Sequence, residues 1–268
     1  MDSDRPVERR QTDVMDPDRA RSLLVALGQD PHTAALHALP PFFHQIYFWD
    51  AQPPKALGRD GHPQVGGLIP DMGLPRRMWA GGRLSFHAPL TVGETAEKIT
   101  VVESATRKEG RSGPLGFVTL RHEIHQNGRL CVTEWQDLVY RHDPDPDAPR
   151  PVPPQARDVA DTSREMTFDS TLLFRYSALT FNGHRIHYDL DYARNVEGYD
   201  GLVVHGPLLA QMLLLLASEA GEVAEFSFRA TSPLMHFETA RLCRSGGDMW
   251  VRAEDGRQNM QATVVYRT

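Results

Sequence analysis

Alternating apolar and polar positions dominate the stretch from Arg83 to Arg141. Four runs in this stretch repeat with a period of two and are rich in β-branched and aromatic residues, a pattern typical of half-buried β-strands. Asn127 and Gly128 separate the last two runs, and Asn-Gly is a strong signal for a tight hairpin turn. The first half of the chain is therefore predicted to end in an antiparallel sheet.

Two segments have a helical pattern instead. Asp16 and Pro17 open a stretch whose leucines share one helical face, and Gly28 suits its end. The second segment, residues 207–220, is apolar nearly all round and is followed by Gly221. Such a helix must be buried on most sides, and a curved antiparallel sheet wrapped around it is one way to bury it.

Proline and glycine mark the segments between these elements. Residues 51–82 are rich in both yet retain large apolar side chains, so we predict a long ordered loop, which in a compact domain is often functional. Residues 142–160 are dense in proline and aspartate and are predicted to connect two halves, because proline interrupts helix and sheet alike. Residues 167–173 are predicted as a short strand, and four strand-like runs follow the apolar helix.

The two halves of the chain resemble each other. LSFHAPL at 84–90 is echoed by FSFRATSPL at 226–234, and the last strand-like run of each half ends in Val-Tyr-Arg. Short words agree by chance at times, but the order of elements also repeats, which favours a duplication. We therefore predict two repeats, residues 1–141 and 161–268, joined by the connector 142–160.

The composition narrows the class of protein. Of the 268 residues, 40% are hydrophobic and 24% are charged, which suits a soluble globular protein. The net charge is −6 and no long basic stripe occurs, so a nucleic-acid partner is not expected. The apolar run 208–217 is too short to span a membrane, and the charged N-terminus lacks a secretion signal. We expect a cytoplasmic protein in which Cys131 and Cys243 are reduced.

The densest group of polar residues lies at 174–189, in the sequence FRYSALTFNGHRIHYD. This stretch is interpreted either as a polar surface loop or as part of a functional site. His184 and His187 would suit a metal ion on a helix, but no third ligand stands at a recognisable spacing. Ser177 lacks the Gly-x-Ser-x-Gly frame of a nucleophile elbow. We therefore expect neither a metal nor another cofactor.

Several sequence words resemble a known family. YSALTFNGHRIHYD (176–189) and GLVVHGPLL (201–209) look like the C-terminal repeat of the MaoC-like, or hydratase-2, enzymes. Three words are similar to the N-terminal repeat of the same family: RRMWAGGRLSF (76–86), KEGRSGPLGFV (108–118) and EWQDLVYR (134–141). The branch that they resemble contains 3-hydroxyacyl-thioester dehydratases and mesaconyl-CoA and itaconyl-CoA hydratases.

The resemblance implies an α+β double hot-dog fold, with two repeats that each wrap a curved antiparallel sheet around a buried helix. It also implies an enzyme that adds or removes water at the double bond of an enoyl thioester. Within the branch, the expected reaction converts mesaconyl-CoA or itaconyl-CoA to citramalyl-CoA. A (3R)-hydroxyacyl-thioester dehydratase of the fatty-acid type, a hot-dog thioesterase and a non-catalytic acyl-CoA-binding subunit are the alternatives. An acyl-CoA is the implied partner, and a homodimer is possible.

The family's hydratase motif has an Asp five residues before a His. The His position falls on His187, our candidate general base and acid, because an imidazole titrates near ambient pH. The Asp position holds Asn182, an amide that cannot take a proton and can only position water or substrate. The backbone N–H of Gly206, at the start of the apolar helix, is expected to hold the thioester oxygen. Only the second half carries this motif, so we expect the first half to shape the substrate site.

Other residues are expected to contact the substrate. Arg76, Arg77 and Arg111 form either a solvated basic patch or a site for CoA phosphates or a free acyl carboxylate, which arginine binds well. Trp79 is expected either to line the acyl pocket or to belong to the core. The remaining candidates lie in the polar stretch or at the helix start: Tyr176, Ser177, Arg185 and His205.

Overall fold

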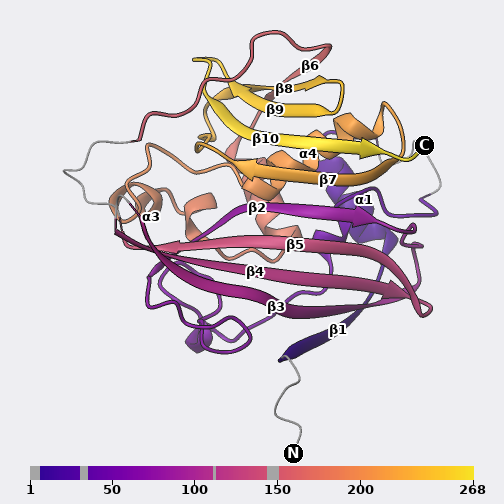
Figure 1. The fold of residues 1–268 in the computed structure, drawn as a ribbon, viewed down its shortest axis with the longest axis horizontal. Coiled ribbons are helices and arrows are strands. Elements are labelled where there is room, and N and C mark those ends of the chain that lie inside the picture. The colour runs from indigo at the N-terminus through magenta and orange to yellow at the C-terminus, as the bar shows by residue number, and fades with distance from the viewer. Residues whose placement is uncertain (1–6, 31–35, 111–112, 144–150) are drawn as a thin grey trace, which may run out of the picture.

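Ten antiparallel β-strands form one continuous sheet (Figure 1). The computed structural model describes residues 7–30, 36–110, 113–143 and 151–268. Across the sheet the order is β1-β3-β4-β5-β2-β7-β10-β9-β8-β6. The strands are β1 (Glu8–Val14), β2 (Arg76–Phe86), β3 (Thr95–Gly110), β4 (Gly113–Gln126), β5 (Arg129–Arg141), β6 (Thr162–Thr167), β7 (Val223–Ala230), β8 (Thr239–Ser245), β9 (Asp248–Ala253) and β10 (Gln258–Tyr266).

The two halves of the chain repeat one strand order. From the central pair β2–β7 outward, the first half continues β5-β4-β3-β1 and the second half continues β10-β9-β8-β6. The central pair contains the two sequence words whose likeness predicted a duplication, with Leu84 opposite Phe226 and Gly82 opposite Phe228. The repeated topology therefore supports the prediction that the two halves are copies of one unit.

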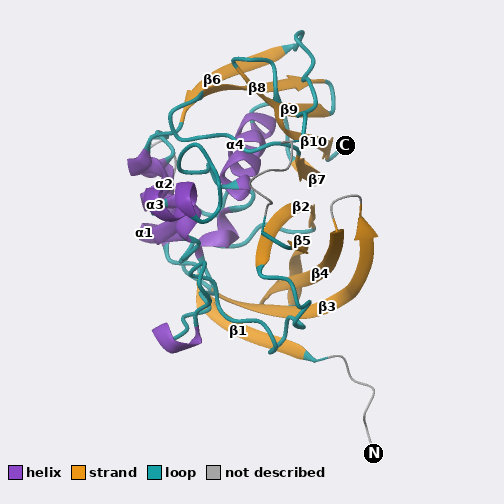
Figure 2. Cartoon of the chain, turned by 90° about the vertical axis from the view of Figure 1, so that its left-hand side faces the viewer, coloured by secondary structure: helices purple, strands orange, loops and turns teal. Residues whose placement is uncertain are grey.

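Equivalent helices follow the two outermost strands. α1 (Pro17–Ala26) begins after Asp16, and α2 (Ser170–Leu179) begins after Asp169. Each aspartate side chain accepts a backbone N–H of the first helical turn, a group that the helix itself leaves without a partner. The two helices lie on the same side of the sheet (Figure 2).

Residues 167–173 do not form the short strand predicted from the sequence. β6 ends at Thr167 and α2 begins at Ser170, with the fully buried Phe168 between them. A short apolar run fits a strand and a buried helix equally well. The 2.7 Å capping bond from the N–H of Leu172 to Oδ1 of Asp169 favours the helix here.

The helix α4 (Gly206–Ser218) is the buried helix that the sequence predicts. Ten of its 13 residues are buried, and it packs against strands of the second half (Figure 2). Within the described part of the first half, no helix of this length corresponds to it. There, Phe42 and the 3-10 turn η1 (Phe43–Ile46) join the same core as the leucines of α4. The other short elements are η2 (Pro54–Ala56), η3 (Arg185–His187) and α3 (Leu190–Asn195).

The loop predicted at 51–82 ends earlier, because β2 already begins at Arg76. Gly81 and Gly82 belong to this strand. A Cβ on Gly81 would lie 2.6 Å from the carbonyl oxygen of Phe228, and a Cβ on Gly82 would lie 2.7 Å from that of Trp135. Glycine at these two positions therefore permits the close approach of neighbouring strands and does not mark a turn.

The structure also describes part of the predicted connector and both cysteines. The connector at 142–160 follows β5 and precedes β6, and its residues 144–150 lie outside the described ranges. Cys131 and Cys243 are buried free thiols, and burial raises the pKa of each. Among the residues that the structure describes, no helix is both long enough and apolar enough to cross a bilayer.

Candidate active site

A cavity of about 1390 Å³ is lined by residues of both halves. The first half contributes parts of the loop before β2, of β2 itself, and of β4 and β5. The second half contributes parts of α2, of the segment 182–188, and of the first turn of α4. The continuous sheet thus brings together residues that are far apart in the sequence.

His187 is held at this cavity by η3. Its Nδ1 donates a hydrogen bond to the carbonyl oxygen of Val203 at 2.7 Å. A carbonyl can only accept, so Nδ1 carries the proton and the lone pair of the neutral ring is on Nε2. Burial, reinforced by the nearby His62, lowers the pKa of His187 to about 3. The ring is therefore neutral at pH 7 and able to accept a proton.

His205 lies behind His187 and does not line the cavity. It is fully buried at the start of α4, and the centroids of the two stacked rings are 3.6 Å apart. Its Nε2 hydrogen-bonds the hydroxyl of Ser177 at 2.8 Å, and the ring of Tyr176 packs edge-on against it. The position of His205 favours the interpretation that it orders the helix start over a direct contact with substrate.

Tyr176 and Ser177 reach the cavity from α2. Both are buried, and the Tyr176 hydroxyl has no hydrogen-bond partner among the described residues. Burial raises the pKa of this phenol far above its usual value, so it stays protonated. A buried phenol O–H without a partner is a donor available to a ligand in the cavity.

Asn182 and Gly206 line the same cavity as His187. The Oδ1 atom of Asn182 accepts the backbone N–H of His184 at 3.0 Å, so the side chain already fixes the loop before η3. Gly206 begins α4, and the first N–H groups of a helix have no acceptor within that helix. A Cβ on Gly206 would meet only the carbonyl oxygen of Trp79, at 3.8 Å. Packing within the chain therefore does not require glycine here.

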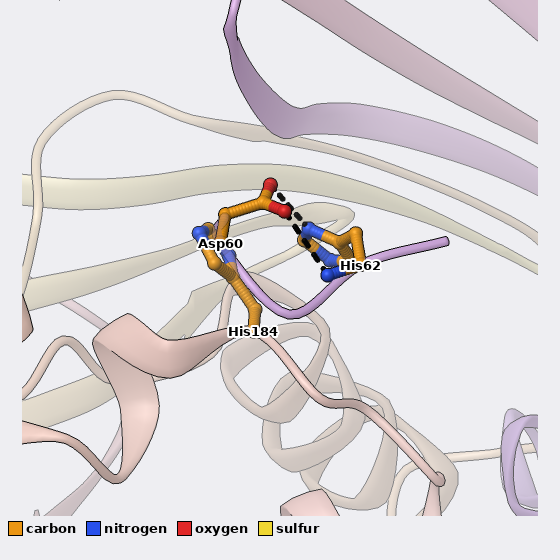
Figure 3. Close-up of side chains that lie close together, drawn as sticks. All are labelled: Asp60, His62 and His184. Carbon is orange, nitrogen blue, oxygen red and sulfur yellow. Dashed lines mark hydrogen bonds and ion pairs between the residues drawn. The ribbon is translucent and has the colours of Figure 1, made fainter. Parts of the chain in front are cut away.

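Two residues that the sequence did not reveal, Asp60 and His62, lie in the loop before β2 close to His184 (Figure 3), and His62 lines the cavity. The Nδ1 atom of His62 donates to Asp60 Oδ2 at 2.9 Å, and the backbone N–H of His62 donates to Asp60 Oδ1 at 3.0 Å. The His184 ring lies 4.4 Å from the His62 ring, between centroids, and 5.3 Å from the His187 ring. This arrangement was missed in the sequence analysis because His184 stands 122 positions after His62 in the chain.

Side-chain ligand atoms of Asp60, His62 and His184 lie within 4.8 Å of one another. The sequence argument against a metal, that no third group accompanies the histidines, therefore does not hold for His184. The facing atoms of Asp60 and His62 are already joined by a hydrogen bond, however. We interpret the set as a hydrogen-bonded Asp–His pair beside a second imidazole.

Burial dominates the electrostatics of this group. It lowers the pKa of His62 to about 4, with Arg77 acting in the same direction and Asp60 opposing it. Burial also lowers the pKa of His184 strongly, with help from His62 and His187. Burial opposes the ionisation of Asp60, but hydrogen bonds from His62 outweigh it and lower the pKa of this carboxyl.

The arginines predicted to bind substrate have different surroundings. Arg76 is buried and forms an ion pair with Glu197 at 2.7 Å, while Arg77 also lines the cavity. Arg141, which the sequence analysis missed, pairs with Arg76 across β2 and β5 and lines the cavity too. Arg111 lies outside the described residues.

Arg185 is not among the residues that line the cavity. Its guanidinium forms an ion pair with Asp189 at 2.7 Å and lies over the ring of Tyr192. The sequence prediction of a substrate contact therefore has no support from its position, because the i, i+4 spacing to Asp189 draws the side chain away.

Trp79 serves the core and the cavity together. It lines the cavity, packs near Phe42 and Phe228, and donates its indole N–H to the carbonyl of Gly81 at 2.9 Å. The two interpretations of this residue from the sequence are therefore compatible.

A buried polar cluster lines another part of the cavity in the first half. Glu134 accepts hydrogen bonds from Gln45 at 2.7 Å and is within 2.9 Å of His44 Nε2. Burial would raise the pKa of Glu134, but its contacts with His44, His122 and Lys98 outweigh burial and lower it. Its members lie on η1 and on the three strands β3, β4 and β5, so no contiguous sequence motif indicates the cluster.

Comparison with known proteins identifies the family. The model of the hydroxyacyl-thioester dehydratase type 2 family matches residues 42–236. A curated relative, the mesaconyl-C(4)-CoA hydratase of Chloroflexus aurantiacus, is 45% identical over 255 residues, which cover 91% of each chain. Both observations involve most of this chain.

Solved structures agree on the fold. A MaoC-like dehydratase from Phytophthora capsici superposes with a TM-score of 0.71 at 13% identity, covering 98% of this chain and 97% of its own. A Mycobacterium tuberculosis protein described as having a double hot-dog fold gives a TM-score of 0.58 at 16% identity, covering 98% and 96%. The predicted double hot-dog fold is confirmed, and the chain belongs to the hydroxyacyl-thioester dehydratase type 2 family of hydro-lyases.

Proposed function

We propose that this protein hydrates a branched dicarboxylyl enoyl-CoA, converting mesaconyl-CoA or itaconyl-CoA to citramalyl-CoA. The observation that carries the proposal is that His187, with its Nδ1 bonded to Val203, and the first turn of α4 line one cavity. The 45% identical relative named a mesaconyl-C(4)-CoA hydratase supports the choice of acyl group.

The proton chemistry falls to His187 in this proposal. Water must lose a proton as its oxygen attacks Cβ, and the Nε2 lone pair of a neutral imidazole is suited to accept that proton. The bond from Nδ1 to Val203 keeps the ring in the required tautomer. The stacked His205 restrains the ring plane from behind.

The first turn of α4 would stabilise the charge that develops on the thioester oxygen. The N–H of Gly206 stands at the positive end of a buried helix, where partial charges are poorly screened by water. A preorganised donor of this kind contributes roughly 3 kcal/mol to lowering a barrier. The Tyr176 hydroxyl offers a second donor in the same cavity.

Asn182 would position water or substrate rather than transfer a proton. Its Oδ1 is occupied by the N–H of His184, so its amide N–H groups are the part that can face a ligand. The family's motif has a carboxylate at this position. An amide cannot transfer a proton in its place, so another group can take part in the proton transfer.

The arginines favour a substrate with a free carboxylate. Glu197 already neutralises Arg76, whereas Arg77 lines the cavity, as does Arg141, which stands opposite Arg76 in the strand pair. A carboxylate on the acyl group would match such a site, since guanidinium groups bind carboxylates through paired hydrogen bonds.

We also propose the division into repeats 1–141 and 161–268, with the first repeat shaping the acyl site.

A panel of thioesters tests the function. The protein is expected to hydrate mesaconyl-C4-CoA, with loss of the conjugated enoyl-thioester absorbance and a mass gain of one water. His187→Ala should lower turnover more than a hundredfold, on the order expected for a proton-transfer group. Release of free CoA thiol without hydration would instead show a thioesterase, and turnover of straight-chain enoyl-CoAs alone would show a fatty-acid-type dehydratase.

The assembly state and the cell compartment are further parts of the proposal. Within one chain the two halves already pair edge to edge, because β2 and β7 are neighbouring antiparallel strands of one sheet. A dimer of whole chains in the cytoplasm stays a prediction, and light scattering of the purified protein measures its molar mass directly.

A further inference from the structure

A hydration needs an acid as well as a base, and the motif supplies only one titratable group. Asn182 cannot donate a proton to carbon at neutral pH. His187 makes its Nδ1 bond to a neutral carbonyl, and no carboxylate contacts its ring among the residues that the structure describes. His187 begins the reaction as a neutral ring, so it holds no proton to donate until water has given it one. The group that protonates Cα is therefore to be sought elsewhere in the cavity.

His62 differs from the other cavity imidazoles because a carboxylate is bonded to it. Asp60 accepts both the Nδ1–H and the backbone N–H of His62, so the ring and the carboxylate are fixed relative to each other. The Nδ1 bond leaves Nε2 as the atom that gains or loses a proton. His62 lines the cavity together with His184 and His187.

The loop that carries this pair is joined tightly to the catalytic segment of the second half. The backbone N–H of Arg185 donates to the Asp60 carbonyl at 2.9 Å. Gly61 has a φ of +86°, and a Cβ there would overlap the carbonyl of Gly183. A Cβ on Gly183 would lie 2.6 Å from the Gly61 carbonyl. The two segments can approach this closely because both residues are glycine.

We propose that the Asp60–His62 pair is the general acid that works with His187, so that the two halves of the chain each supply one proton-transfer group. This inference rests on the proposed hydratase function. It assigns a catalytic role to the first half, which we expected from the sequence only to shape the substrate.

Two proton transfers accompany the addition of water, one at His187 and one at His62. An O–H bond of water breaks, its proton bonds to Nε2 of His187, and the hydroxyl oxygen bonds to Cβ. The π electrons move toward the thioester, and the Nε2–H bond of the His62 imidazolium breaks as its proton bonds to Cα. One proton then passes from His187 through the intervening His184 to His62, which restores the starting state. Asp60 remains ionised throughout.

The charged and titratable groups around His62 are Asp60 on its own loop, Arg77 on β2, and His184 and His187 from the second half. Arg77 opposes protonation of His62, and Asp60 favours it. A substrate carboxylate that pairs with Arg77 would remove this opposition. Binding of a dicarboxylyl thioester would thereby raise the pKa of His62 above the value of about 4 that burial gives it in the free protein, and favour the protonated form that the reaction uses.

His62→Gln is the direct test, with mesaconyl-C4-CoA as substrate. We expect kcat to fall about a hundredfold with little change in KM, since a proton-transfer group is removed. His125→Gln is the matched control, because His125 on β4 also lies near a carboxylate, Glu123, but outside the cavity. Circular dichroism and urea unfolding establish that each variant is folded.

The pH profile separates a catalytic role from a structural one. The alkaline limb of kcat, which reports the substrate complex, should disappear in His62→Gln, because that limb reports loss of the proton from His62. Asp60→Asn should shift the alkaline limb to lower pH, because the carboxylate no longer holds the proton on His62. A pair that merely braces the loop would leave the limbs where they are in the wild type.

The outcomes distinguish this inference from the function itself. Near-normal kcat with unchanged pH limbs in His62→Gln would overturn the acid assignment and leave the hydratase proposal intact. Activity lost on treatment with EDTA and restored by Zn²⁺ would also overturn it, since the residues would then bind a metal. A wild-type protein that hydrates no enoyl-CoA would overturn both.

Discussion

The imidazole of His187 lies flat against that of His205, with ring planes 21° apart and centroids separated by 3.6 Å. One ring faces the cavity and the other is fully buried, held by Ser177 through a 2.8 Å hydrogen bond. Each ring thus has a hydrogen bond that fixes its rotation. The orientation of the proposed base depends on a residue behind it that no substrate reaches.

Replacing Ser177 should therefore affect turnover more than binding. Ser177→Ala removes the partner of a buried imidazole nitrogen, and we expect a loss of about 1–3 kcal/mol in the free energy of unfolding. We also expect kcat to fall several-fold while KM stays constant, because His205 gains freedom to rotate under His187. Ser227→Ala, which removes a hydroxyl pair on an exposed strand face, is the control. A raised KM with normal kcat would instead show that Ser177 contacts substrate.

Much of the fold was predictable because it rests on local patterns. The strand alternation from Arg83 onward, the capped helix after Asp16 and the all-round apolar helix at 207–220 each occur in the structure as predicted. The segment 167–173 was not predictable, because a short apolar run does not distinguish a strand from a helix. Gly81 and Gly82 were predicted to belong to the loop. They lie in β2, where glycine permits close contacts with other strands that a local sequence pattern does not show.

The candidate site likewise contains residues that local sequence motifs predicted and residues that they did not. His187, Asn182 and Gly206 stand in contiguous motifs and line one cavity, as their sequence positions suggested. Asp60 and His62 lie in a loop of the other half and meet this segment only through the tertiary fold. Such non-local pairs leave no spacing signal in a single sequence.

Restoring the family's acidic residue should change the pH dependence of the reaction. Asn182→Asp keeps an acceptor for the N–H of His184, so the local fold should survive. The added negative charge favours protonated imidazoles in the cavity, which raises the pKa of His187 from its depressed value of about 3. The acid limb of kcat/KM should therefore move to higher pH, by about one unit or more. An acid limb at the wild-type position would show that residue 182 does not act electrostatically on the base.

Stability should fall as the pH falls below 7. Burial first of all lowers the pKa values of His62 and His122 to about 4 and that of His187 to about 3. The unfolded chain protonates these rings near pH 6.5, so between that pH and about 4 it binds more protons than the folded chain does. Each ring therefore costs about 2 kcal/mol of stability between pH 6.5 and 5.

Urea unfolding at pH 7.5, 6 and 5 measures this effect. His122→Gln should weaken the pH dependence by about a fifth, since burial also lowers the pKa values of His184 and His205 and one of five such rings is removed. The half-exposed His125 should make little difference when changed to Gln. An unfolding midpoint that is constant from pH 7.5 to 5 would contradict the assignment of these rings as neutral and buried.

Arg77 offers a test of which anion the cavity recognises. Arg76 is unsuitable, because its removal leaves Glu197 buried without its cation and should destabilise the protein by several kcal/mol. Arg77→Gln should raise KM for mesaconyl-C4-CoA by about tenfold or more, the scale of a lost charged hydrogen bond. KM for crotonyl-CoA, which has the same CoA but no free carboxylate, should hardly change.

The comparison of the two substrates decides between carboxylate and phosphate recognition. If Arg77 binds a CoA phosphate, both thioesters contain the anion and both KM values should rise together. Arg83→Gln is the matched control, since Arg83 lies on the same strand but is exposed, stacks on Trp135 and is not part of the cavity lining. Because Arg77 also opposes protonation of His62, loss of its charge should raise the pKa of that ring. In Arg77→Gln the alkaline limb of crotonyl-CoA hydration should accordingly move to higher pH, which links the anion site to the proposed acid in one measurement.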